Sequence, residues 1–424
     1  MPTALPVILF DDGRGELAPL TDLRPAFDVR VGALTVAERV AMDTAVTLAA
    51  LVCPEPLAAI TRERHAVPVN PARFPAGPCL LVNSRWAAFD PSAASNLDPD
   101  EAAVSTSTGE LLFAHANPAL LQRLMLGDCS ELRTVPWGVE QNEAAFSLMQ
   151  RPWHARRSRD AAIAVDLGIA AARFTPMSGL PVGVVCVAGW FGGEVTAKGG
   201  RGVFIHPSAR VYPTTLLDHE SGPIVIDDHA VIRPGAIITG PAYIGPHSTI
   251  LDRAVIRGNT AIGPHCKVAG EISGTVFQGY SNKAHDGFLG DSWVGEWVNL
   301  GAGTTNSNLL NTYSEIICRA TPDGPNERTG ETFLGAIIGD HVKTAICTRL
   351  MTGAILHTGS MFATTAPVSG TVGRFTWATD AGVRQYRFDK FLDVARAAMA
   401  RRKIEPSEAY IERLRALAAK TVSI

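Results

Sequence analysis

Aliphatic residues recur at every sixth position through much of the second half of this sequence, and this spacing strongly constrains the fold. The longest unbroken run has eight members: Ile226, Ile232, Ile238, Ile244, Ile250, Ile256, Ile262 and Val268. Shorter runs precede and follow it: Ile205, Val211 and Leu217; Val294 and Leu300; and Ile338, Leu350 and Leu356, with Thr344 at the remaining six-residue step. A six-residue period fits neither a 3.6-residue helix nor two-residue strand alternation. It fits a coil with three flat faces, whose stacked turns of about 18 residues bury one aliphatic column.

Turn-forming residues stand between the aliphatic positions, where the corners of such a coil fall. They are Gly235, Gly245, Pro246, Gly258, Gly263, Pro264 and Gly295. Glycine and proline relieve the backbone at each bend. The sequence therefore predicts a left-handed parallel β-helix over residues 203–365, in preference to a β-sandwich, which needs two-residue alternation.

Three histidines follow the same 18-residue turn. His229, His247 and His265 are expected to stack on one corner about 4.8 Å apart, the spacing of neighbouring strands. A metal site is one interpretation of this column. The preferred interpretation is a repeated polar corner facing solvent, because metal ligands usually converge and carry supporting carboxylates. We therefore predict no metal ion here.

Length and composition limit the class of protein. A chain of 424 residues is too long for one ordinary core and indicates at least two domains. Its 46% hydrophobic content and net charge of −3 indicate a soluble protein, with no general attraction to nucleic acid or to a membrane surface. The seven cysteines lack a C-x-x-C pair, and the first residues lack the pattern of a signal peptide. We expect a cytoplasmic location.

One stretch carries the chemistry. Residues 283–308 read KAHDGFLGDSWVGEWVNLGAGTTNSN. This stretch resembles the acetyltransferase domain of the GlmU family, the bifunctional enzymes that make UDP-N-acetylglucosamine. That family has K-A-G-H, then L-G-D-x-x-[IV]-G-x-x-V-N-[IL]-G-A-G-T and an asparagine five residues on.

The resemblance implies a role for each matching residue. His285 is the expected general base, which removes a proton as a sugar amine attacks the thioester of acetyl-CoA. An imidazole suits this step because its ordinary pKa lies close to neutral pH. Asn299 and Asn308 are expected to bind substrate. Ala302 and Gly303 are expected to lie against acetyl-CoA, with the Ala302 N–H near the developing oxyanion.

The resemblance also implies a phosphate site, with some departures from the family pattern. Arg233 matches an arginine that grips the sugar 1-phosphate, and Lys283 is assigned to substrate binding. The family's K-A-G-H is one residue shorter here, and Phe288 stands where the family has a tyrosine. Residues 309–332 form a longer and more polar loop than the family's.

The first domain, residues 1–173, resembles a divergent sugar nucleotidyltransferase. A strand-like segment leads into a glycine-rich turn at Gly13, Arg14 and Gly15, which can cradle phosphates with backbone N–H groups. The family's Thr-Arg pair is lost, and Arg24, Arg30 and Arg14 are the residues expected to supply positive charge instead. Where the family places its magnesium aspartate, this chain has Asn83 and Arg85. Asp11, Asp12, Asp160 or Asp166 are the alternative carboxylates, and no spacing selects among them. Mg²⁺ and UTP are therefore expected only if this domain is active.

The remaining segments are a glycine-rich linker at residues 174–202 and a helical extension at residues 366–424. Phe388, Phe391, Leu392, Ala395 and Met399 line one helical face, and Pro406-Ser407 starts a second helix. The basic run Arg401-Arg402-Lys403 is either a solvated cluster or a group for CoA phosphates.

The preferred hypothesis is an acetyl-CoA-dependent N-acetyltransferase acting on glucosamine 1-phosphate or a related amino sugar phosphate. Its nucleotidyltransferase-like domain would couple the product to UTP, and the resemblance implies a homotrimer. One alternative is a nucleotidyltransferase whose β-helix serves only assembly or regulation. The other is a non-catalytic sugar-nucleotide sensor.

Overall fold

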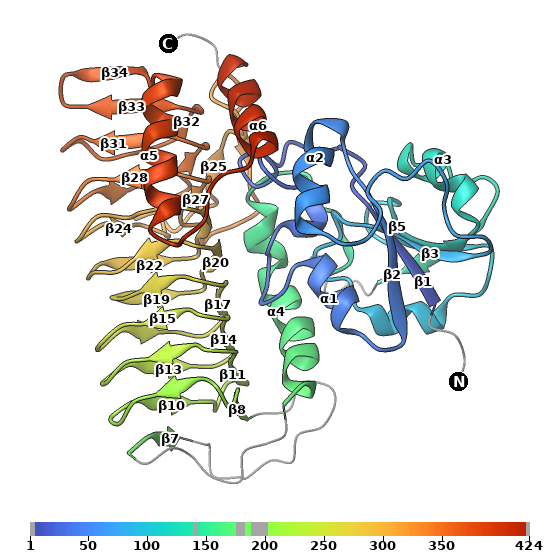
Figure 1. The fold of residues 1–424 in the computed structure, drawn as a ribbon, viewed down its shortest axis with the longest axis horizontal. Coiled ribbons are helices and arrows are strands. Elements are labelled where there is room, and N and C mark those ends of the chain that lie inside the picture. Colours follow the sequence, from blue (N-terminus) through green and yellow to red (C-terminus); the bar gives the residue numbers. More distant parts are fainter. Residues whose placement is uncertain (1–4, 139–142, 144, 175–182, 188–201, 421–424) are drawn as a thin grey trace. The chain divides into compact units, whose positions relative to one another are not determined.

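The computed structural model describes residues 5–138, 143, 145–174, 183–187 and 202–420 (Figure 1). The chain divides into two compact units, residues 1–17 with 23–165 and residues 18–22 with 166–424. The division at residues 165 and 166 falls within helix α4 (His154–Ala172).

The first unit is built on a six-stranded mixed sheet with the order β2-β1-β3-β5-β4-β6. Its strands are β1 (Leu5–Phe10), β2 (Val46–Val52), β3 (Cys79–Asn83), β4 (Glu101–Ser105), β5 (Leu111–Ala116) and β6 (Arg133–Trp137). Its other helices are α1 (Val36–Met42), α2 (Glu55–Arg64) and α3 (Leu121–Met125), with 3-10 turns at Ala26–Asp28, Pro91–Asn96 and Pro118–Leu120. β1 pairs in parallel with β2 and β3, and β5 pairs antiparallel with β3 and β4. This Rossmann-like α/β arrangement confirms the fold class predicted for the first domain.

The second unit contains a left-handed parallel β-helix with three faces, as predicted. Figure 1 shows its coils stacked in sequence order from green to red. The first face is the sheet β8 (Val203–Ile205), β11 (Ile224–Ile226), β14 (Ala242–Ile244), β17 (Thr260–Ile262), β20 (Val276–Gly279), β23 (Trp293–Glu296), β27 (Ile337–Ile338), β30 (Ile355–Leu356) and β32 (Thr371–Val372).

The second face begins with β9 (Arg210–Val211), β12 (Val231–Ile232), β15 (Thr249–Ile250), β18 (Lys267–Val268) and β21 (Asn282–Lys283). It continues with β28 (Lys343–Thr344), β31 (Met361–Ala363), β33 (Thr376–Thr379) and β34 (Gly382–Gln385). Single bridges from Asn282 to Asn299 and from Asn299 to Lys343 join the two parts.

The third face comprises β7 (Val185–Val187), β10 (Leu216–Asp218), β13 (Ile237–Thr239), β16 (Val255–Ile256), β19 (Glu271–Ser273) and β22 (Phe288–Gly290). The pair β24 (Thr305–Asn306) and β29 (Arg349–Leu350) follows in later coils. All eight aliphatic residues of the longest run are fully buried in one core along the coil. The six-residue rhythm therefore marks the inward positions, as predicted.

The histidine column also forms as predicted. The ring centroids of His229 and His247 lie 5.0 Å apart, and those of His247 and His265 lie 4.8 Å apart. The column then continues through Tyr280 and Trp297, with centroid separations of 4.7 and 4.6 Å. All five residues have positive φ, so these aromatic corners are turned in the left-handed region without glycine.

Two helices follow the β-helix, α5 (Phe388–Ala400) and α6 (Glu408–Ala419). The predicted start of the second helix is confirmed, because the Ser407 side chain caps α6 by accepting a hydrogen bond from the Tyr410 N–H at 3.2 Å. Phe391, Ala395 and Met399 of the predicted apolar face are buried. Tyr410 also hydrogen-bonds the His341 ring at 2.8 Å, which ties α6 to the coil.

Three segments predicted as linker, helix or loop contain β-strands. The expected linker, residues 174–202, lies mostly outside the described residues, but β7 within it pairs with β10 and already belongs to the third face. The expected helical extension from residue 366 instead begins with β32, β33 and β34, because the six-residue spacing continues to the buried Phe362 and Val368. The loop 309–332 contains the antiparallel pair β25 (Ile317–Cys318) and β26 (Glu327–Arg328).

Candidate functional site

His285 lies on the corner of the β-helix between the second and third faces, after β21 and before β22. Its side chain is exposed. Several coils contribute to one hollow of about 430 Å³ at this corner, which we call the corner hollow. It is lined by Leu251, Asp252, Ala269, Ala284, His285, Asp286, Ala302 and Gly303. His285 thus shares a concave site with both residues expected to contact acetyl-CoA.

Gly287, two residues after His285, allows its coil to approach the next coil closely at Thr304. Gly287 has a φ of +123°, and a Cβ there would lie only 2.2 Å from the Thr304 carbonyl oxygen. The β-strand partners Lys267 and Asn282 are 15 residues apart here, instead of the 18 that separate Thr249 from Lys267. The shortened coil and the bare glycine backbone set the position of this corner.

A second hollow, of about 690 Å³, lies on the other side of His285 and is called the helix hollow. It is lined by Lys267, Tyr280, Asn282, Ala284, His285, Trp297, Val298, Asn299, Lys343, Val394, Ala397, Ala398, Arg401 and Arg402. The second face supplies its floor, the stacked Tyr280 and Trp297 rings stand at one side, and α5 with the residues after it forms a wall. His285 and Ala284 border both hollows, and Asn299 lies in this one.

The main chain of Ala302 offers a hydrogen-bond donor inside the corner hollow. The neighbouring N–H groups are already used: Gly301 donates to Thr344 Oγ1 at 3.0 Å, and Gly303 donates to the Asp286 carbonyl at 3.1 Å. Within the part of the chain that the structure describes, the Ala302 N–H donates to no protein group. A free backbone N–H in a hollow shared with an imidazole can stabilise a developing oxyanion.

Lys283 lies directly below this corner. It is 1% exposed, and its ammonium donates to the carbonyl oxygens of His285 and Asp286, and more weakly to that of Ala269 at 3.5 Å. Burial lowers the pKa of Lys283 to about 8, although the charge of Asp286 opposes the shift. Its position favours supporting the corner over direct contact with substrate.

Arg233 and Asn308 lie outside both hollows. The Arg233 guanidinium pairs with Asp252 at 3.3 Å and lies over the Tyr212 ring at 4.8 Å from the centroid. Asn308 donates to Asp291 Oδ2 at 2.8 Å, beyond β22. Arg233 reaches the corner hollow only through Asp252, which lines it. The predicted substrate roles of Arg233 and Asn308 remain predictions.

The first unit places its glycine-rich turn at the carboxyl end of β1. Gly13 and Gly15 have positive φ, and the Asp11 side chain accepts hydrogen bonds from the N–H groups of Gly13 and Ala26. Arg14 is exposed, whereas the Arg24 side chain is fully buried. The sheet therefore keeps Arg14 accessible at this turn and holds Arg24 inside.

The last residue of β3, Asn83, and Arg85 just after it contact this turn, but neither is a carboxylate. Arg85 forms a two-point ion pair with Asp12, and Asn83 donates to the same carboxylate at 3.0 Å. Burial alone would raise the pKa of Asp12, but hydrogen bonding and charge from Arg85 bring it below its usual value. Asp12 is thus held by a guanidinium, which competes with any divalent cation for its oxygens.

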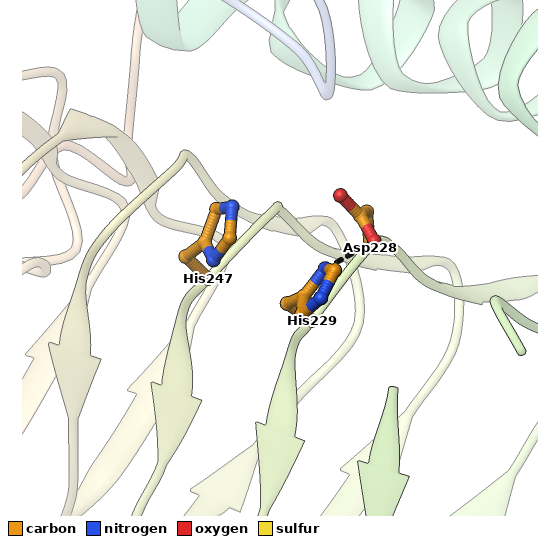
Figure 2. A group of neighbouring side chains, drawn as sticks. All are labelled: Asp228, His229 and His247. Carbon is orange, nitrogen blue, oxygen red and sulfur yellow. Dashed lines mark hydrogen bonds and ion pairs between the residues drawn. The ribbon is translucent and has the colours of Figure 1, made fainter. Parts of the chain in front are cut away.

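At the start of the histidine column, Asp228, His229 and His247 have side-chain atoms that could coordinate a metal ion. Figure 2 shows Asp228 beside His229, with His247 on the next coil. One ligand atom from each lies within 4.8 Å of the others. However, the two imidazole planes are nearly parallel, at 18°, so their ring nitrogens do not converge. Asp228 is also hydrogen-bonded to His229 and Ser208, an arrangement that fits a polar corner better than a metal centre.

Several residues of the helix hollow carry no motif or regular spacing in the sequence. Lys267, Asn282 and Lys343 occupy equivalent outward positions on the second face, but irregular coil lengths hide that relation in the sequence. Tyr280 and Trp297 continue a ring column whose regular spacing ends at His265. Arg401 belongs to the basic run predicted to be either a solvated cluster or a group for CoA phosphates. Strand pairing aligns Lys267, Asn282 and Lys343 across neighbouring coils, whereas a fixed 18-residue step along the chain does not.

Comparison with known proteins matches parts of this chain. Residues 7–173 match the family described as sugar nucleotidyl transferase. A stretch of 83 residues is 35% identical to a bifunctional sugar-1-phosphate nucleotidylyltransferase/acetyltransferase of Sulfurisphaera tokodaii. That alignment spans only 20% of this chain and 20% of the relative.

Solved structures give weak global matches. A hexapeptide transferase family protein from Anaplasma phagocytophilum is 15% identical, over 55% of this chain and 98% of its own, with a TM-score of 0.18. The acetyltransferase domain of PglB from Neisseria gonorrhoeae, in complex with acetyl coenzyme A, is 11% identical over 90% of this chain and 99% of its own, with a TM-score of 0.17.

The fold and the site define a two-part protein, in which a sugar nucleotidyltransferase-like domain precedes a hexapeptide-repeat β-helix. The chain accordingly resembles the GlmU family, with a family-model match over residues 7–173 and a short alignment to one bifunctional relative. Among the helices of the described residues, none has the length and apolar character needed to span a bilayer.

Proposed function

We propose that the β-helix is an acetyl-CoA-dependent N-acetyltransferase acting on glucosamine 1-phosphate or a related amino sugar phosphate. The observation that carries this proposal is the position of His285, which borders two hollows at once. One contains the free N–H of Ala302, and the other contains Asn299. An acyl transfer needs this arrangement, with donor and acceptor meeting at a base.

The proposed reaction uses few protein groups. The acceptor amine attacks the thioester carbonyl of acetyl-CoA while His285 removes a proton from its nitrogen. The N–H of Ala302 hydrogen-bonds the carbonyl oxygen as it becomes negative. The C–S bond then breaks, the amide forms, and the protonated imidazole returns a proton to the leaving thiolate.

In the second proposed reaction, the first unit couples the acetylated sugar phosphate to UTP and releases pyrophosphate. The family match of residues 7–173 and the turn at Gly13, Arg14 and Gly15 support this step. The Asp12–Arg85 pair is the observation against it, because it engages one of the carboxylates beside that turn. A nucleotidyltransferase with a purely structural β-helix is therefore the less favoured alternative, and a sugar-nucleotide sensor without activity is the third.

Two assays on the purified full chain test the proposal. Release of free thiol from acetyl-CoA in the presence of glucosamine 1-phosphate measures acyl transfer, and release of pyrophosphate after addition of UTP and Mg²⁺ measures nucleotidyl transfer. His285→Ala should abolish thiol release without changing the oligomeric state, and His247→Ala, an exposed histidine outside both hollows, should leave it unchanged. Thiol release that survives His285→Ala would exclude this histidine as the base.

The proposed enzyme is a homotrimer, as its resemblance to β-helix acyltransferases implies. Its scattered, unpatterned cysteines favour a cytoplasmic location. The side chain of Ile346 supports an interface beside the site, because it is 71% exposed on the coil next to Ala302. Sedimentation of the wild-type chain should give a trimer, and Ile346→Glu should shift it toward monomer. A monomeric wild type with full activity would contradict the proposed assembly.

A further inference from the structure

The helix hollow is strongly basic. Four of its lining residues are cations, Lys267, Lys343, Arg401 and Arg402, and none of its lining residues is a carboxylate. Arg402 is engaged by protein groups, donating to Asn282 Oδ1 at 3.0 Å and to the His265 carbonyl at 3.2 Å. Within the described residues, none of the four forms an ion pair. The hollow therefore has positive charge that the protein itself does not neutralise.

Lys343 is the most informative of these cations. It lies on the floor of the hollow, and among the described residues its ammonium has one long hydrogen bond, to the Trp297 carbonyl oxygen at 3.3 Å. Burial lowers the pKa of Lys343 to about 8. A desolvated ammonium is costly without an anion or several hydrogen bonds, so its retention beside an open hollow indicates an anionic ligand.

The register of the second face relates this charge to the proposed chemistry. Lys267 lies next to Asn282, which lies next to Asn299, which lies next to Lys343. The floor is therefore a row of two amides between two ammonium groups, and Arg401 stands after the end of α5 beside it. A ligand bound by Lys343 and Arg401 shares its hollow with Asn299 and His285.

We propose that the helix hollow is a phosphate-binding site, in which Lys343 from the floor and Arg401 from the end of α5 hold one phosphate group. The inference deepens the proposed function and rests on it for the identity of the ligand, which is the phosphate of the acceptor sugar. It replaces the expectation that Arg233 grips this phosphate, because Arg233 is paired with Asp252 and lies outside the hollow. CoA carries phosphates too, so the test separates the two sources.

The experiment measures binding by calorimetry on the full-length chain, with glucosamine 1-phosphate, glucosamine and CoA as separate ligands. Arg401→Gln is the principal variant, because Arg401 is exposed and its loss should not disturb folding. Lys343→Gln is the second. Arg396→Gln is the matched control, since Arg396 is exposed on the same helix and does not line the hollow.

We expect Arg401→Gln and Lys343→Gln each to weaken binding of glucosamine 1-phosphate by about tenfold or more, the usual loss for one charge-assisted contact. Binding of glucosamine and CoA should not change, and Arg396→Gln should match the wild type. Weaker CoA binding with unchanged sugar phosphate binding would keep the phosphate site and assign it to the donor. Unchanged binding of both phosphate ligands in Arg401→Gln, or an equal loss in Arg396→Gln, would overturn the inference.

The two proposals fail in different ways. Binding of glucosamine 1-phosphate that depends on Arg401, without any thiol release by the wild type, would refute the acetyltransferase and leave the phosphate site. Thiol release with the same KM for glucosamine 1-phosphate in the wild type and Arg401→Gln would refute the phosphate site alone.

Discussion

The ammonium of Lys283 donates a hydrogen bond to the main-chain carbonyl of His285, from a position buried directly below that residue. It also donates to the Asp286 carbonyl at 3.0 Å, so one cation holds both residues at the tip of the corner. The side chain of His285 is exposed, and its placement depends on this backbone support. Lys283 is therefore a positioning residue for the proposed base.

Lys283→Met should lower the kcat of thiol release by about tenfold or more, because small displacements of a catalytic group are costly. The KM for acetyl-CoA should change little, since the corner hollow keeps its lining. The variant should also lose about 2 kcal/mol of unfolding free energy from unsatisfied carbonyl groups, measurable by urea denaturation. Lys390→Met, at an exposed lysine on α5, serves as the control; an unchanged kcat in Lys283→Met would remove the positioning role.

Ala302→Pro tests the proposed oxyanion contact, because proline removes the one N–H in this segment that no protein group uses. We expect kcat to fall about 100-fold or more, as when a single oxyanion donor is removed elsewhere. Binding of CoA and the thermal midpoint report whether the coil is intact. A folded variant with wild-type kcat would show that another group stabilises the oxyanion.

The ion pair of Asp12 and Arg85 gives a prediction for the first unit. The two side chains are 3% and 1% exposed, and the Asp12 Oδ1 to Arg85 Nε distance is 2.8 Å. Arg85→Met should destabilise the unit by about 3–5 kcal/mol, because it leaves a buried carboxylate without its partner. The double variant Asp12→Asn with Arg85→Met should recover part of that loss in a denaturation cycle. A double variant no more stable than Arg85→Met would mean that the pair is not coupled.

The buried His357 should make the free energy of unfolding depend on pH in the acid range. Burial lowers the pKa of His357 to about 4, below the unfolded value of about 6.5. The unfolded chain therefore binds more protons between these values, so stability should fall as the pH drops from 6.5 to 4. This histidine contributes about 3 kcal/mol of that fall at most.

His357→Gln should flatten this dependence, while an amide can still donate to the Ala320 carbonyl that His357 contacts at 3.1 Å. Thermal midpoints of the wild type and the variant at several pH values between 4 and 7 measure the difference. The exposed His247→Gln variant is the control. Parallel curves for His357→Gln and the wild type would show that His357 is not the titrating group.

In the C-terminal region, the six-residue spacing predicts only part of the structure. The spacing continues to Phe362 and Val368, yet β33 and β34 form a hairpin whose short strands carry no six-residue signal. A helix cap depends only on a few neighbouring residues. The start of α6 at Ser407 could therefore be predicted from the sequence. Residues 309–332 likewise had no period, and only the structure revealed the antiparallel pair of β25 and β26.

The sequence alone determined the β-helix, because one buried aliphatic residue per face is a one-dimensional rule that repeats along the chain. It also determined that His285 and Ala302 belong to one motif. The tertiary structure decided which side chains surround them. Lys267, Asn299 and Lys343 come together on the helix hollow through strand register across coils of unequal length, and Arg401 reaches it from a helix far along the sequence. Contacts between distant segments depend on how coils stack and where helices dock, and no local spacing encodes them.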